Sequence, residues 1–270
     1  MEEHVLGVTK LVNWALRKLT LVFLSALHVH PENTEYPIPN HIAMELVVFV
    51  LAAIFFLWLK SRLSVDSPGG TQQCMEAMLT NPMGVGVQDL LDDLIGHGGE
   101  KYLALLGSVG IFVLACNLIS VVPGFMSPTA DHSVPLGCAV VVFLYYNWSG
   151  IRKNGPIGHV KHFLGPVWWL AWLMLPIELV SNAFRLLSLT VRLWVNMMVS
   201  EILYGLFLGL TVALFVALGR LSPLGYASVV APLALPPVFI LLHVFVAVLQ
   251  AFVFTILPVL YVSQVVAADH

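Results

Sequence analysis

The sequence predicts an all-α, polytopic membrane protein with about five transmembrane helices. Of its 270 residues, 59% are hydrophobic and only 10% are charged, and the mean hydropathy is +0.91. A soluble domain with a solvated surface is rarely so apolar, and several apolar runs approach the roughly 20 residues that a helix needs to cross a bilayer. Breaks rich in proline, glycine and charge separate these runs.

Five apolar segments are predicted to span the membrane, at about residues 42–59, 102–122, 134–148, 170–219 and 236–266. From Pro176 to Gly219 no proline interrupts the fourth segment, so about 44 residues at 1.5 Å each would form a helix near 66 Å long. That length is about twice the hydrocarbon thickness of a bilayer. We therefore expect a strongly tilted or broken helix, which pairs with the last helix in a long hairpin.

Lysines and arginines in the loops predict the direction in which the chain crosses. Lys60 and Arg62 follow the first span, and three more basic residues, Arg152, Lys153 and Lys161, follow the third. The positive-inside rule makes both loops cytoplasmic, so the N-terminus lies outside and the C-terminus in the cytoplasm. Residues 71–100 are too polar to span and are predicted to form a cytoplasmic surface helix. Lys10, Arg17 and Lys18, which this topology places outside, do not follow the positive-inside rule.

Residues 1–41 are predicted to form an N-terminal segment outside the membrane, and residues 42–270 a single membrane domain. Four polar residues of the first segment recur at spacings of three and four, on one side of a helix: Lys10, Asn13, Arg17 and Thr20. This pattern favours a retained amphipathic helix on the membrane surface. The alternative is a signal peptide, because two basic residues precede the apolar stretch LTLVFLSAL.

Composition also excludes several classes of partner. The formal net charge is −3 and no basic block of five residues occurs, which argues against nucleic acid. Cys74, Cys116 and Cys138 lack the spacing of a metal or redox site, so we expect neither a metal nor a cofactor. Without a phosphate-binding loop of the GxxxxGKS or GxxxxGKT type, we expect no nucleotide on this chain.

Ionisable and amide side chains concentrate on the two long helices. Six polar residues, separated by 3, 4, 3, 4 and 4 positions, share a stripe roughly 80° wide on the first of them: Glu178, Ser181, Arg185, Ser188, Arg192 and Asn196. Glu201 follows on nearly the opposite side, about 13.5 Å further along the axis. On the last helix, His243 and Gln250 lie seven residues apart on one face.

An antiparallel pairing of these helices brings the polar residues to common levels. Facing residues in such a pair share one sum of residue numbers, and Glu201 with His243 gives 444, while Arg192 with Gln250 gives 442. Both sums place the turn near residues 221–222. We therefore expect each pair to face across the hairpin.

Arginine in the middle of a membrane helix requires an explanation. It costs at least about 2.5 to 3.5 kcal/mol and is rarely kept unless it faces a cavity or an acidic partner, so Arg192 is predicted to be functional. For the other residues a structural explanation competes. Arg185 can snorkel to the interface, Glu178 can be solvated, His243 can be a packing histidine, and Asn196 and Gln250 can join helices by hydrogen bonds. Asp131 and His132 are expected in solvent.

The motifs SLTVRLWVNMMVSE and LLHVFVAVLQAFVFTILPVLYVS resemble the two signature helices of subunit a of F-type ATP synthases. The resemblance extends to CNLISVVPGF, SPTADHSVPL and KSRLSVDSPGGTQ, and covers about residue 42 to the end. It implies that Arg192 is the essential ring-facing charge and Gln250 its helix partner. It assigns the outer half-channel to Asn196, Glu201 and His243, and the cytoplasmic half-channel to Glu178 with Ser181. The family usually has small residues at positions 195, 199 and 200.

What the resemblance implies for function is a proton-translocating stator subunit that is not itself catalytic. Two offset half-channels would load and unload the carboxylates of a c-subunit ring, and Arg192 would favour their deprotonation. Expected partners are the c-ring, the b-subunit peripheral stalk and lipid, in a bacterial inner membrane. The alternative is a self-contained transporter that uses Arg192 to bind an anionic substrate, but the chain lacks the internal repeats common in such transporters.

Overall fold

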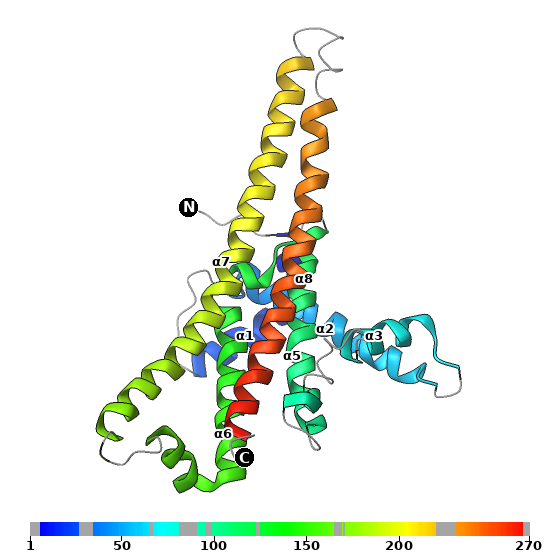
Figure 1. The fold of residues 1–270 in the computed structure, drawn as a ribbon. Helices are drawn as coiled ribbons and strands as arrows, with labels where there is room; N and C mark the ends of the chain where they lie inside the picture. The colour runs from blue at the N-terminus through cyan, green and yellow to red at the C-terminus, as the bar shows by residue number, and fades with distance from the viewer. Residues whose placement is uncertain are drawn as a thin grey trace. The chain divides into compact units, whose positions relative to one another are not determined.

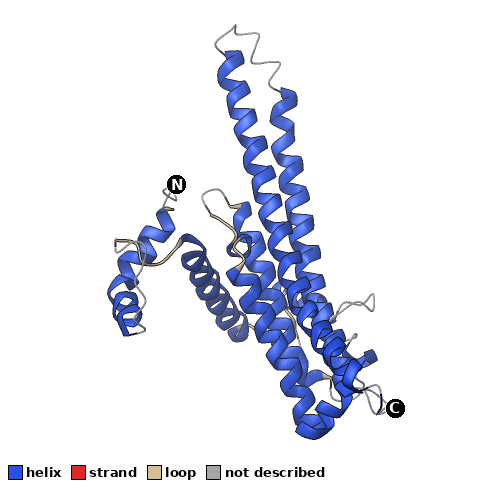
Figure 2. Ribbon diagram, turned by 90° about the vertical axis from the view of Figure 1, so that its left-hand side faces the viewer, coloured by secondary structure: helices blue, strands red, loops and turns tan. Residues whose placement is uncertain are grey.

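The structure, a computed structural model, describes residues 6–26, 35–64, 67–80, 91–94, 99–122, 125–164, 169, 171–219 and 230–266. Over these residues the chain forms helices joined by loops, without a strand (Figures 1 and 2). The α-helices, in chain order, are α1 (Gly7–Ala26), α2 (Asn40–Ser61), α3 (Gly70–Thr80), α5 (Glu100–Leu118), α6 (Ser133–Leu164), α7 (Ala171–Gly219) and α8 (Val230–Val266). The prediction of an all-α protein is confirmed.

Five of the described helices are long and apolar enough to cross a membrane, as predicted: Asn40–Ser61, Glu100–Val121, Ser133–Gly155, Trp172–Ala217 and Pro237–Val266. The third span ends later than the predicted residue 148, because α6 continues to Gly155, where φ is 72° and ψ is 163°. Glycine tolerates this positive φ, so the helical path breaks there. α7 runs through 49 residues in one helix, so the expected alternative of a broken helix is not observed over these residues.

Of the predicted surface helix at residues 71–100, the structure describes α3 and residues 91–94. The remainder, residues 81–90 and 95–98, lies outside the described residues. The turn predicted near residues 221–222 also lies outside them.

The chain divides into two compact units. Unit 1 comprises Met1–Val50, Leu114–Asp131 and Trp194–Leu249, and unit 2 comprises Leu51–Val113, His132–Leu193 and Gln250–His270. Each long helix of the hairpin contributes residues to both units, so the predicted site residues fall into two groups.

In unit 1 the N-terminal helix is held by one amide. Asn13, on α1, is 2% exposed. Its Nδ2 donates to the carbonyl oxygens of Thr9 (2.9 Å) and Ile38 (3.0 Å), and its Oδ1 accepts from the Ile38 nitrogen (3.0 Å). Asn13 therefore points inward and fastens α1 to the extended segment before α2, whereas the polar stripe predicted it on a solvated side. Trp14, the next residue, is 86% exposed.

The core of unit 2 is built from α5, α6 and α8. Tyr102 and Leu106 of α5, Tyr146 of α6, and Val259 and Val262 of α8 are all buried in one cluster. The hydroxyl of Tyr146 hydrogen-bonds Asn182 Oδ1 at 2.7 Å, which ties α6 to α7. This bond satisfies two polar groups that would otherwise be costly in an apolar surrounding.

α5 and α8 approach each other closely at a glycine. A Cβ added to Gly110 would lie 2.1 Å from Thr255 Oγ1 and 3.2 Å from Thr255 Cβ. Thr255 Oγ1 already donates to the carbonyl of Ala251 at 2.8 Å. Small residues permit such close helix contacts in membranes, so the glycine is required for this packing.

We predict that Gly110→Ala destabilises the protein by about 1–3 kcal/mol, because the threonine must rotate and give up its bond to Ala251. Thermal unfolding in detergent measures the loss, and adding Thr255→Ala should restore part of it. Gly137→Ala on α6 is the matched control, because its Cβ would meet open space. Equal stability of the Gly110 and Gly137 variants would contradict the proposed close contact.

Candidate functional site

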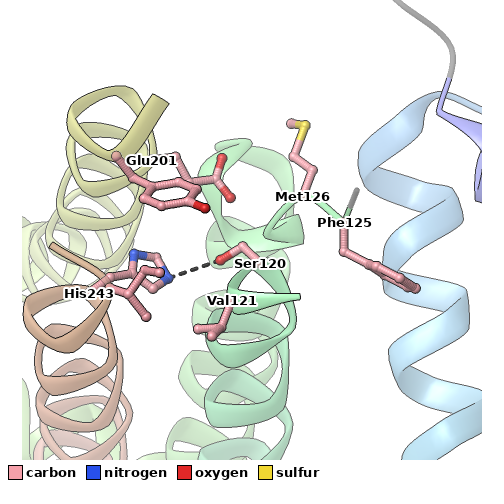
Figure 3. Close-up of a pocket in the computed structure, with 8 residues that line it drawn as sticks. Ser120, Val121, Phe125, Met126, Glu201 and His243 are labelled. Atoms are coloured by element: carbon pink, nitrogen blue, oxygen red, sulfur yellow. Dashed lines mark hydrogen bonds between the residues drawn. The ribbon is translucent and has the colours of Figure 1, made fainter. Parts of the chain in front are cut away.

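Unit 1 contains a cavity of about 190 Å³ between the end of α5, the segment that follows it, α7 and α8 (Figure 3). It brings together two residues predicted for the outer path, Glu201 and His243. The lining residues are Ser120, Val121, Phe125, Met126, Glu201, Tyr204, Ile240 and His243. The wall is therefore largely apolar, with a carboxyl, an imidazole and two hydroxyls placed in it.

His243 is buried, and both of its ring nitrogens have hydroxyl partners. Nε2 lies 2.9 Å from Ser120 Oγ, and Nδ1 lies 2.6 Å from Ser200 Oγ. Figure 3 shows the first of these bonds. A neutral imidazole donates from one nitrogen and accepts at the other, and a serine hydroxyl can do either. The three side chains thus form a hydrogen-bonded chain, and Nε2 also lies 3.3 Å from the carbonyl oxygen of Asn117.

Glu201 is fixed by the loop after α5. Its Oε1 accepts a hydrogen bond from the backbone nitrogen of Ser127 at 2.6 Å. Ser127 is itself buried and donates from Oγ to the carbonyl of Cys116 at 2.9 Å. The carboxyl group is therefore held in one position while it faces the cavity.

A buried polar network supports this loop. Thr129 Oγ1 donates to Asn117 Oδ1 at 2.6 Å, and Asn117 Nδ2 donates to the carbonyl of Ala247 at 3.3 Å. Through these bonds α8 fixes α5, and α5 fixes the loop. Asp131, expected in solvent, instead lies 3.6 Å from His41 Nδ1 through its Oδ2.

The predicted hairpin register is right to within a few residues. Ser200 contacts His243, and the rings of Phe207 and Phe239 stack with centroids 4.0 Å apart. The residue numbers of these pairs sum to 443 and 446, against the predicted 444 and 442. Glu201 and His243 share the cavity, as expected. Glu201 bonds Ser127, whereas His243 bonds Ser120 and Ser200. Among the described residues, no hydrogen bond joins Glu201 to His243.

Asn196, the third residue predicted for the outer path, lies elsewhere in unit 1. It lines a separate hollow of about 230 Å³ together with Val199, Ser200 and four apolar residues of α7 and α8. Ser200 belongs to this hollow and also bonds His243. Its hydroxyl therefore connects the region of Asn196 to the imidazole.

In unit 2, Arg192 has an exposed side chain on α7, whereas Gln250 on α8 is 6% exposed. Arg192 and Gln250 were expected to face each other. In the part of the chain that the structure describes, no contact between them supports this expectation. Over that same part Arg192 forms no ion pair or hydrogen bond. The structure leaves a permanent positive charge on the helix surface.

The residues predicted for the cytoplasmic path lie near Arg185. Its guanidinium lies 4.0 Å from Glu178 Oε1 and 5.2 Å from the centre of the Tyr261 ring. Arg185, for which snorkelling was expected, thus pairs with the acid predicted for this path. Ser181 is partly buried, and its neighbour Asn182 makes the bond to Tyr146 described above.

Sequence reasoning missed the hydroxyls that hold the two outer residues, those of Ser120 and Ser200, and the loop nitrogen of Ser127. The sequence does contain a signal for Ser200, because it is next to Glu201 and its number adds with that of His243 to 443, close to the predicted sum of 444. Ser120 and Ser127 lie where helical periodicity ends, so spacing gives no signal for them.

The fold and site define a class: a multi-pass helical membrane protein in which hydrogen-bonded ionisable side chains line cavities, and in which Arg192 is exposed on a membrane-spanning helix. Comparison with known proteins gives the family. The sequence profile of the ATP synthase A chain family matches residues 42–263. ATP synthase subunit a of Koribacter versatilis is 39% identical over 267 residues, covering 99% of both chains. The corresponding subunit of Solibacter usitatus is 42% identical over 234 residues, covering 87% of this chain and 90% of that one.

The chain therefore belongs to the ATP synthase subunit a family. It is a proton-conducting stator subunit of the Fo sector and has no catalytic activity of its own. Membership of an ATP synthase complex also implies partner subunits. The self-contained transporter considered from the sequence is not supported.

We predict that cysteines replacing Ser200 and His243, in a background without the three native cysteines, form a disulfide in high yield. Disulfides require Cα atoms within about 7 Å, and the two side chains are in contact. Oxidation followed by a mobility shift after cleavage of the α7–α8 loop measures the yield. Pairs displaced by two residues, at 198 with 243 and at 202 with 243, are controls, and equal yields from all three would show that the register is wrong.

Proposed function

We propose that the cavity containing Glu201 and His243 is part of the half-channel open to the outside, and that Glu178 and Ser181 belong to the half-channel open to the cytoplasm. The outer assignment is supported by the chain of bonds from Ser120 through His243 to Ser200, beside the hollow that Asn196 lines. Gln250 is assigned to the same path at its inner end. These groups exchange protons through hydroxyls and imidazole without a large movement of the backbone.

The single observation that carries the proposal is the exposed guanidinium of Arg192. A cation in a membrane helix is rarely kept without an acidic partner or a polar cavity, and the described residues offer it no ion pair. The missing partner is proposed to be a carboxylate of the c-ring. Because a nearby cation favours the ionised form of a carboxylate, each ring carboxylate would release its proton on reaching Arg192.

Rotation follows from the same charge. Arg192 is proposed to separate the two half-channels, so a proton taken up from the outside reaches the cytoplasmic side only after the ring carries it around. Each proton then delivers about 2.3 kcal/mol per 100 mV of membrane potential. A b-subunit peripheral stalk would hold the subunit still against the ring.

Orientation is the remaining part of the proposal. The basic loops that contain Lys60 and Arg152 are assigned to the cytoplasm of a bacterium by the positive-inside rule, which leaves the N-terminus outside and the C-terminus inside. α7 then runs outward, so that Glu201 is nearer the outside than Glu178.

We predict that Arg192→Ala lowers proton-driven ATP synthesis about 10- to 1,000-fold, since loss of a neighbouring cation shifts a carboxylate toward its protonated form by that factor. Membrane insertion should be unaffected, because a charge has been removed from an apolar helix. Synthesis in inverted vesicles is the measurement. Ser188→Ala, a change on the same polar stripe, is the matched control, and normal coupled synthesis by the Arg192 variant would refute the proposal.

A second prediction concerns the sides of the membrane. Glu201→Gln should change the dependence of synthesis on outside pH more than on inside pH, because an amide keeps the bond from Ser127 but cannot exchange a proton. Glu178→Gln should do the reverse. The experiment clamps pH separately on each side of vesicles in both orientations. If both substitutions altered the response to the same side, the assignment of two half-channels would fail even with Arg192 essential.

A further inference from the structure

Unit 2 contains a second cavity, of about 460 Å³, whose lining is basic and aromatic. Three of its seven lining residues are cations, and none is acidic. The seven lining residues come from the start of α5 and from the part of α6 before its break at Gly155: Lys101, Tyr102, Tyr145, Trp148, Ser149, Arg152 and Lys153. The proton path described above does not use any of them.

The three cations differ in how free they are. Lys153 Nζ donates to the carbonyl of Val266, which fastens the end of α8, and the neighbouring Asn154 bonds Val265 in the same way at 3.1 Å. Lys101 Nζ lies 5.2 Å from the centre of the Tyr102 ring. Arg152 is exposed, and among the described residues no carboxylate pairs with it or with Lys101. These two are therefore available to an anion.

The cavity lies at the level where two apolar spans end. Lys101 is the second residue of the span Glu100–Val121, and Arg152 comes three residues before the end of the span Ser133–Gly155. Tyrosine and tryptophan are enriched at this level of a membrane, where an apolar ring can carry a polar tip. Tyr102, Tyr145 and Trp148 provide such rings, with the two tyrosine rings edge to face at 6.1 Å.

An apolar stripe continues from the cavity along α6. Val141, Leu144, Trp148 and Ile151 are exposed and are separated by 3, 4 and 3 residues, so they share one face of the helix. Trp148, 63% exposed, belongs both to this stripe and to the cavity wall. A basic hollow joined to an apolar face matches a ligand with an anionic head and a hydrocarbon tail.

We propose that this cavity binds the phosphate group of an anionic phospholipid, with the acyl chains lying along the stripe of α6. Arg152 presents a planar fork suited to phosphate oxygens, and Lys101 adds a point charge. A free phosphate would use the cations but not the stripe, and an acidic protein segment would not need a hydrocarbon-facing stripe. Basic hollows between helices at this membrane level suit anionic headgroups. The site would fasten α5 and α6 to one class of lipid.

The test is binding of phosphatidylglycerol to the full chain in detergent, measured by native mass spectrometry against phosphatidylcholine. The double substitution Lys101→Gln with Arg152→Gln should weaken binding of the anionic lipid about 30-fold, since each basic residue near an anionic surface contributes about fivefold. Lys153 is kept, because it holds α8. The conservative pair Lys101→Arg with Arg152→Lys should retain most of the binding and shows that the fold is intact.

Matched removal of two charges elsewhere, by Lys60→Gln with Arg62→Gln at the end of α2, controls for general attraction to anionic lipid. An equal loss from that pair would overturn the site. A second arm adds inorganic phosphate alone, and binding of phosphate with no gain from an attached lipid would assign the cavity to a soluble anion instead. If the Lys101→Gln with Arg152→Gln variant bound lipid normally but failed to assemble into the ATP synthase, the cavity would be assigned to an acidic partner subunit. Either result would overturn the proposal.

Discussion

The hydrocarbon of a membrane offers no water to polar side chains, and this constraint governs the arrangement of the described residues. A polar group placed there must be bonded by the chain itself, or it costs several kcal/mol. Among the described residues, the only buried side-chain polar atom without a hydrogen-bond partner is Thr9 Oγ1. Asn13, Asn117, Asn182 and His243 each have partners from a different helix or segment. Polar side chains therefore act as the fasteners between helices.

The same constraint applies to the groups that are proposed to carry protons, which are bonded by serines. An imidazole that is to pass a proton needs a partner on each nitrogen that can donate in one state and accept in the next. Hydroxyls meet this requirement, whereas a carboxylate directly on the ring would hold the proton at one place. The positions of Ser120 and Ser200 on opposite nitrogens of His243 are therefore consistent with the proposed transfer. Glu201 faces the same cavity, where the backbone nitrogen of Ser127 holds its carboxyl group.

Much of this organisation could be predicted from the sequence, because it depends on composition and on helical period. The five spans follow from apolar length, and the approach of α7 to α8 near Glu201 and His243 follows from two residue-number sums. What periodicity could not supply are contacts made where a helix ends. Ser127 lies in a loop and donates to Glu201. Asn13 belongs to a polar stripe of α1, and its side chain is buried because it bonds the segment around Ile38. Loop conformation is set by such tertiary bonds and carries no repeating signal.

Arg192 shows how far a single chain can satisfy the constraint. Another arginine of the polar stripe has partners within the protein: Arg185 lies near Glu178 and the Tyr261 ring. Arg192 lies seven residues further along the same face and is exposed without an ion pair among the described residues. An unpaired arginine on a membrane-spanning helix agrees with the proposal that its partner belongs to another subunit. A carboxylate partner of the kind proposed would be anionic beside the cation and neutral when it faces lipid, so its protonation would change as it passes. The unpaired charge thus links the membrane's intolerance of ions to the movement of protons.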